Sequence, residues 1–180
     1  MNLPNKLTAA RIGMTVLMAV FILIHGTVWA WLSLAMYIAA SLTDFFDGQI
    51  ARKRGLVTNL GKFMDPLADK ILNYSVMILL IGEEMVPPVA VVIILFREFL
   101  VAGIRQSAAE QGRVVAANIW GKAKTFVQDI SLGVMLFFRA LEVGFTAPLS
   151  RVLIWICAAL TVISGAIYLV RNRDILKGAD

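Results

Sequence analysis

The chain has 180 residues, of which 59% are hydrophobic and only 16% are charged. A soluble domain averages about 45–50% apolar residues, so this excess argues against a soluble protein and favours a membrane protein. The formal net charge is +5. In a membrane protein, basic residues that gather on the cytoplasmic side explain such a charge, so it does not indicate a nucleic-acid partner.

Apolar stretches recur along the whole chain, and several reach the length of about 20 residues that crosses a bilayer. They predict an all-α integral membrane protein with six transmembrane helices in one bundle. The predicted spans cover residues 10–25, 29–51, 63–82, 87–105, 119–138 and 151–170. The links between them are short, so we expect a single domain over residues 1–180.

The N-terminal sequence MNLPNKLTAAR does not have the pattern of a cleavable signal peptide. Pro4 suits the first turn of a helix, where its missing N–H has no partner to lose. Residues 2–9 either form a short interfacial helix on the membrane surface or simply begin the first span. The sequence leaves both alternatives open.

Most basic residues fall on one side of the membrane if both termini are cytoplasmic. That side then carries Lys6, Arg11, Arg52, Lys53, Arg54, Lys62, Lys70, Arg105, Arg113, Lys122, Lys124, Arg171, Arg173 and Lys177. Arg139 and Arg151 fall outside, and Arg97 lies within a span. This asymmetry follows the positive-inside rule, and the basic face meets anionic phospholipid head groups. We therefore expect a multi-pass protein of the cytoplasmic membrane.

Nucleophilic catalysis is not expected from this sequence. Cys157 is the only cysteine, it lies in an apolar run, and it is expected to be a small buried hydrophobe. His25 is the only histidine and falls in an outer loop. This topology therefore does not predict a catalytic cysteine or histidine near the acidic residues.

Four aspartates lie at the predicted cytoplasmic ends of the second and third spans: Asp44, Asp47, Asp65 and Asp69. At about 100° per residue, the first two share one narrow helix face with Gly48 and Ala51. The other two share a face with Gly61, provided that the third helix begins by that residue. Two carboxylates from each helix can then converge on one point.

Four convergent carboxylates would be costly without compensation, because like charges at a membrane boundary repel and resist leaving water. Solvated aspartates paired with Lys53 or Lys70 would explain one or two of them, but not four in register with small residues. Two Mg²⁺ or Mn²⁺ ions would match the charge. Arg52 beside such ions suits a phosphate ligand, so the pattern predicts a metal-assisted diphosphate site.

The segment resembles the signature of the CDP-alcohol phosphatidyltransferase family. It reads Asp44, two residues, Asp47-Gly48, two residues, Ala51-Arg52, eight residues, Gly61, three residues, Asp65, three residues, Asp69. All eight specified positions agree. The resemblance implies a six-helix membrane bundle, usually a homodimer, whose site opens to the cytoplasmic leaflet.

By this resemblance the four aspartates hold two divalent ions, and Asp69 also acts as the general base. Gly48, Ala51 and Gly61 make room for the cytidine nucleotide, while Arg52 contacts its phosphates. The acceptor hydroxyl attacks the lipid-side phosphorus of the CDP-lipid, and CMP leaves without a covalent enzyme intermediate.

Two further stretches, NLPNKLTAARI and REFLVAGIRQSAAEQGRVVAANIWGKAKT, resemble the branch of this family that uses CDP-diacylglycerol and glycerol 3-phosphate. The first carries Asn5 and Thr8, which are expected at the nucleotide. The candidates for binding the acceptor's phosphate are Arg105, Lys122, Lys124 and Arg171.

The charged residues of the second stretch differ in their expected roles. Lys122 and Lys124 point in different directions on a helix, so at most one of them faces the site. Arg97 and Glu98 lie inside a span and need partners there, for which Asp129 is a candidate.

Three alternatives remain open from the sequence. The same chemistry could use another acceptor, such as serine, inositol phosphate or phosphatidylglycerol. A divalent-cation transporter could use four acids, but it would need them near the middle of the membrane. Membrane prenyltransferases also combine aspartate-rich motifs with Mg²⁺, but they usually have more spans and lack the Gly-Ala-Arg pattern.

Overall fold

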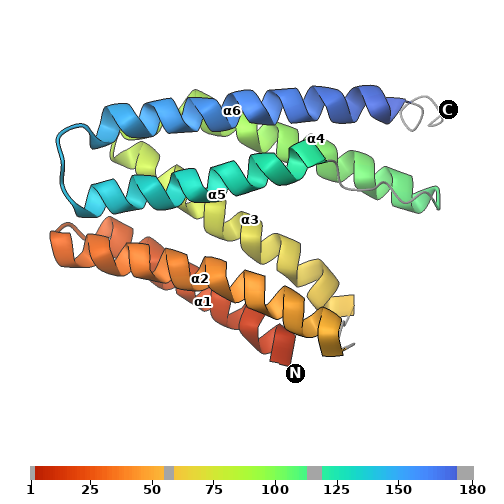
Figure 1. Cartoon of the computed structure of the whole chain (residues 1–180), viewed down its shortest axis with the longest axis horizontal. Coiled ribbons are helices and arrows are strands. Elements are labelled where there is room, and N and C mark those ends of the chain that lie inside the picture. The colour runs from red at the N-terminus through yellow and green to blue at the C-terminus, as the bar shows by residue number, and fades with distance from the viewer. Residues whose placement is uncertain (1–2, 55–58, 113–118, 174–180) are drawn as a thin grey trace. The chain divides into compact units, whose positions relative to one another are not determined.

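The computed structural model describes residues 3–54, 59–112 and 119–173, with side chains for residues 7–43, 64–112 and 119–173. These ranges contain six helices and no strand (Figure 1). The helices are α1 (Leu3–Leu23), α2 (Thr27–Arg54), α3 (Asn59–Gly82), α4 (Pro88–Glu110), α5 (Ile119–Ala140) and α6 (Thr146–Arg171). The prediction of an all-α chain with six helices is confirmed.

The helices differ in how well they fit a membrane span. Within the described ranges, α6 is the one helix that is long and apolar enough to cross a bilayer by length and composition. Shorter apolar segments occupy Leu7–Leu23 and Thr27–Thr43. Charged residues interrupt the other helices, so a six-span topology stays a prediction from the sequence.

The N-terminal residues belong to α1. This helix runs without interruption from Leu3 to Leu23, so residues 3–9 form its first turns and not a separate interfacial helix. Pro4 lies at the start of the helix, where a missing amide hydrogen costs little.

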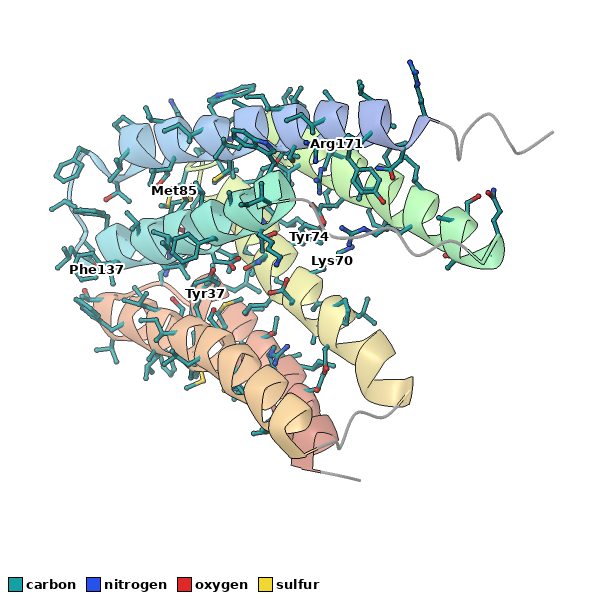
Figure 2. All side chains as sticks on the ribbon, turned by 45° about the vertical axis from the view of Figure 1, so that its right-hand side comes forward. Tyr37, Lys70, Tyr74, Met85, Phe137 and Arg171 are labelled. Atoms are coloured by element: carbon teal, nitrogen blue, oxygen red, sulfur yellow. The ribbon has the colours of Figure 1, made fainter. Side chains whose placement is uncertain are left out.

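The chain divides into two compact units. The first comprises the residues up to 83 together with 132–146, and the second comprises 84–131 and the residues from 147 onward. In the first unit, α1 packs against both α2 and α3. Tyr37 of α2, labelled in Figure 2, donates a hydrogen bond to Oδ1 of Asn73 on α3 at 3.3 Å.

Arg139 is the main polar link at one end of the first unit. Its Nε and Nη2 atoms donate to the two carboxylate oxygens of Glu83, and Nη2 also donates to the carbonyl of Ile22 at 2.9 Å. The guanidinium therefore joins the ends of α1, α3 and α5. Bidentate geometry of this kind is the strong form of an arginine–carboxylate pair, so Arg139 has a structural role that the sequence did not reveal.

The second unit contains α4, the first part of α5, and α6. Val101, Ile104 and Ala108 of α4 pack against Tyr168 of α6 in a buried cluster. On another face of α4, Phe96 and Phe99 are each 69% exposed. Large aromatic side chains exposed to this extent are uncommon on soluble proteins but suit contact with lipid.

Candidate active site

Both helices that carry the four aspartates belong to the first unit. α2 runs to Arg54 and therefore includes the backbone of Asp44 and Asp47, and α3 includes Asp65 and Asp69. The two helices contact each other and α1. α3 begins at Asn59. Gly61 therefore belongs to the same helix as Asp65 and Asp69, as a shared helix face requires.

Several predicted site residues have side chains outside the described part of the chain. They are Asn5, Asp44, Asp47, Gly48, Ala51, Arg52 and Gly61. Their backbones lie in α1, α2 and α3. The convergence of the two aspartate pairs therefore remains a prediction.

Asp65 and Asp69 lie about one turn apart on α3, and both side chains are partly buried. Oδ1 of Asp65 accepts a hydrogen bond from the hydroxyl of Thr8 on α1, with an oxygen–oxygen distance of 2.6 Å. Thr8 is only 2% exposed. The sequence placed Thr8 at the nucleotide, whereas the structure brings it to an aspartate of the site.

Arg11 is a residue whose position the sequence did not reveal. Its side chain is fully buried, although the charge pattern marked it only as a membrane anchor. It shares one face of α1 with Thr8 and Thr15, both buried. A buried guanidinium requires a compensating charge.

The first unit offers few carboxylates to meet that requirement. Its residue range contains six acidic residues: Asp44, Asp47, Asp65, Asp69, Glu83 and Glu142. Glu83 binds Arg139, and Glu142 accepts a hydrogen bond from Thr27 at 2.6 Å. The four aspartates are the remaining carboxylates of this residue range.

Lys124, a candidate for the acceptor phosphate, lies in a buried charge cluster of the second unit. Its side chain is 3% exposed, and its Nζ lies 2.9 Å from Oε1 of Glu98. The same oxygen accepts a hydrogen bond from Nη1 of Arg97 at 2.7 Å. The prediction that Arg97 and Glu98 need partners is confirmed, and Lys124 is a partner that it did not name.

Close packing holds Arg97 in this cluster. A methyl group added at Gly165 of α6 would lie 2.8 Å from Cγ of Arg97, closer than real contacts allow. Only glycine therefore leaves room for the arginine in this position. The cluster joins α4 and α5 by charge and α6 by close packing.

The other predicted acceptor-binding cations are exposed to solvent. Lys122 is exposed whereas Lys124 is buried, which confirms that the two lysines point in different directions. Arg105 is exposed and its guanidinium carbon lies 5.6 Å from the centre of the Tyr168 ring, within cation–π range. Arg171, at the C-terminal end of α6, is also exposed.

The chemistry of the donors fits a hard divalent cation. Asp65 and Asp69 supply carboxylate oxygens from successive turns of one helix, and Mg²⁺ and Mn²⁺ prefer such ligands. Among the described side chains there is no group of three or more potential metal ligands. Asp44 and Asp47, the other half of the predicted set, lie outside the described side chains.

Comparison with known proteins identifies the family. The model of the CDP-alcohol phosphatidyltransferase family matches residues 1–163, which include the whole aspartate signature. The chain is 38% identical to a CDP-diacylglycerol–glycerol-3-phosphate 3-phosphatidyltransferase of Bacillus subtilis (strain 168), over 98% of this chain and 97% of the relative.

Two further relatives extend the comparison to other bacteria. A protein of the same name from Rickettsia bellii is 38% identical over 93% of each chain. A probable phosphatidylglycerophosphate synthase of Mycobacterium tuberculosis (strain H37Rv) is 36% identical over 97% of this chain and 83% of the relative. With the signature and these matches together, the chain belongs to the CDP-alcohol phosphatidyltransferase family.

Proposed function

We propose that this chain is a phosphatidylglycerophosphate synthase. It transfers the phosphatidyl group of CDP-diacylglycerol to glycerol 3-phosphate and releases CMP, a step in anionic phospholipid synthesis. The observation that carries the proposal is the near full-length similarity to a relative whose name states both substrates. The aspartate signature independently supports the reaction class.

The four aspartates hold the divalent ions in this proposal, as Mg²⁺ or Mn²⁺. Bound ions would neutralise charge on the diphosphate during the displacement. Arg52 binds the phosphates of the nucleotide, and Gly48, Ala51 and Gly61 leave space for the cytidine. Asn5 adds a polar contact to the nucleotide.

Asp69 takes the proton from a hydroxyl of glycerol 3-phosphate as that oxygen attacks the phosphorus next to the diacylglycerol. The new bond joins this phosphorus to the acceptor oxygen. The bond to the bridging oxygen of the diphosphate breaks, and CMP leaves with that electron pair. The reaction needs no covalent enzyme intermediate.

The reaction takes place at a membrane surface in this proposal. The substrate combines a charged diphosphate with two acyl chains, so its reacting phosphorus lies at the interface of lipid and water. The apolar helix α6 and the exposed aromatic residues of α4 support a membrane location. We further infer a multi-pass topology, a site at the cytoplasmic leaflet and a homodimer, as the family resemblance implies.

Chelation is expected to abolish transfer, and added Mg²⁺ or Mn²⁺ should restore it, because the carboxylates need a cation to converge. CMP release from CDP-diacylglycerol measures the effect. Asp44→Ala and Asp65→Ala should lose activity while eluting from size exclusion as the wild type does. Full activity in excess chelator would show that the reaction does not require divalent ions.

The phosphate of glycerol 3-phosphate needs cations other than Arg52, which serves the nucleotide. We assign Arg105 and Lys124 to it, with Lys122 and Arg171 as further candidates. Lys124 is buried and donates to Glu98, which fixes the orientation of its ammonium group. Arg105 is exposed beside Tyr168 and free to reach a soluble anion.

Arg105→Gln and Lys124→Gln are each expected to raise the KM for glycerol 3-phosphate about tenfold or more. A lost charge-assisted hydrogen bond costs about 1.5–3 kcal/mol. The KM for CDP-diacylglycerol should change much less. Steady-state kinetics with each substrate varied in turn provide the measurement.

The control for these two variants is Arg151→Gln. Arg151 is exposed, and its Nη2 donates to the carbonyl of Glu84 at 3.2 Å. Arg139 is unsuitable as a control because its removal would break the contact to Glu83. If Arg105→Gln and Lys124→Gln both leave the glycerol 3-phosphate KM unchanged, the acceptor pocket lies elsewhere.

A further inference from the structure

The hydrogen bond between Thr8 and Asp65 connects two helices that are 57 residues apart in sequence. Its oxygen–oxygen distance of 2.6 Å lies in the range of charge-assisted bonds from a hydroxyl to a carboxylate. The threonine is almost fully buried. A short bond in a buried place holds its acceptor more firmly than one exposed to competing water.

Thr15 provides the comparison on the same helix face. It is as buried as Thr8, and its hydroxyl donates to the carbonyl of Arg11 in its own helix at 2.9 Å. Such back-bonding is a common use of a helical threonine. The hydroxyl of Thr8 donates to a carboxylate on a different helix, so it links two elements of the fold.

A buried threonine is also a well-fixed donor. Branching at Cβ restricts its side-chain rotamers in a helix, so the hydroxyl oxygen has few positions to occupy. Its bond occupies one acceptor position on Oδ1 of Asp65 and restricts rotation of the carboxylate. The carboxylate is then held at a defined orientation toward a further ligand.

We infer that Thr8 is a positioning residue of the aspartate site, acting on a divalent cation through Asp65 and not by contact with the nucleotide. The inference rests on the proposed metal site. Partners that orient metal ligands typically contribute about 10–100-fold in metal affinity. Removal of the Thr8 hydroxyl should therefore weaken cation binding even when no lipid substrate is present.

The test compares side chains that differ only by the hydroxyl. Thr8→Val removes it and keeps the shape, whereas Thr8→Ser keeps it and removes the methyl group. Thr15→Val is the matched control, since that hydroxyl bonds only within α1 among the contacts described. The full-length protein is purified in detergent, and Mn²⁺ binding is followed by the electron paramagnetic resonance signal of the free ion.

We expect Thr8→Val to weaken Mn²⁺ binding about 10–100-fold, with Thr8→Ser and Thr15→Val close to wild type. Thermal unfolding is recorded for every variant, so that a loss of Mn²⁺ affinity can be told apart from a loss of folded protein. If Thr8→Val does not fold, Thr8→Ser and Thr8→Ala form a second pair that differs by the hydroxyl alone. The serine variant should then bind Mn²⁺ more tightly than the alanine variant.

Three results would overturn the inference. If Thr8→Val and Thr8→Ala both bind Mn²⁺ as tightly as the wild type, the protein has a metal site but Thr8 does not position it. Weaker CDP-diacylglycerol binding in chelator, with unchanged Mn²⁺ affinity, would make Thr8 a nucleotide contact. A wild-type protein that binds no Mn²⁺ would refute the metal site itself, and the inference with it.

Discussion

Asp69→Asn is expected to lower turnover about 10²–10⁴-fold while CDP-diacylglycerol binding stays measurable. Asparagine keeps the size of the side chain and one oxygen, but it cannot take the proton of the acceptor, and loss of a general base has effects of this size. Turnover is measured as CMP release, and binding is measured separately in equilibrium titrations.

Two controls accompany the Asp69 variant. Mn²⁺ affinity must be followed in parallel, because Asp69 is also assigned to the metal ions. Glu110→Gln is the matched substitution, since Glu110 is an exposed acid on α4 with one weak contact to Gln106 at 3.4 Å. Turnover near the wild-type rate in Asp69→Asn would show that another group accepts the proton.

Glu98→Ala is expected to lower the free energy of unfolding by about 3–5 kcal/mol, the range found when one member of a buried ion pair is removed. Glu98 is the carboxylate that accepts from both Arg97 and Lys124. Its removal leaves the ammonium of Lys124 buried without this partner. Denaturant unfolding of the purified protein in mixed micelles provides the measurement.

A double variant separates charge from packing at this position. Glu98→Ala combined with Lys124→Met removes both members of the pair, so no ammonium is left buried beside a missing carboxylate. We expect it to be more stable than Glu98→Ala alone, because the two substitutions are coupled. If the free energy of unfolding of Glu98→Ala lies within about 0.5 kcal/mol of the wild-type value, the substitution behaves like one at the surface. That result would contradict a stabilising buried pair between Glu98 and Lys124.

The number and order of the helices could be predicted from the apolar segments, but not their bounds. The sequence predicted a second span over residues 29–51, whereas α2 extends from Thr27 to Arg54. Counting apolar residues finds the part of a helix suited to lipid. The helix itself continues through charged residues, because arginine and lysine have good helix propensity.

The spacing of the aspartates could also be predicted, because helical periodicity depends on the sequence alone. The partner of Thr8 could not. A threonine near the start of a helix has the same local sequence whether it contacts a nucleotide, its own helix or another helix. Only the packing of α1 against α3 brings Thr8 to Asp65.

Basic residues were the least predictable group. The positive-inside pattern placed Arg11 and Lys124 on the cytoplasmic side and Arg139 on the other side, but it depends on charge alone and does not indicate burial. The structure shows Arg11 and Lys124 buried and Arg139 bound to Glu83. Long-range ion pairs leave no local signal in the sequence, so the pairing of Lys124 with Glu98 and of Arg139 with Glu83 could not be predicted.

The most direct test of the proposed function is an acceptor panel. The purified protein is supplied with CDP-diacylglycerol and Mg²⁺, together with glycerol 3-phosphate, serine, inositol phosphate or phosphatidylglycerol in separate reactions, and both CMP and the lipid product are measured. We predict CMP release and phosphatidylglycerophosphate formation with glycerol 3-phosphate alone. CMP release with another acceptor but not with glycerol 3-phosphate would contradict the named function, and divalent-cation flux in liposomes without CMP release from any acceptor would contradict the reaction class.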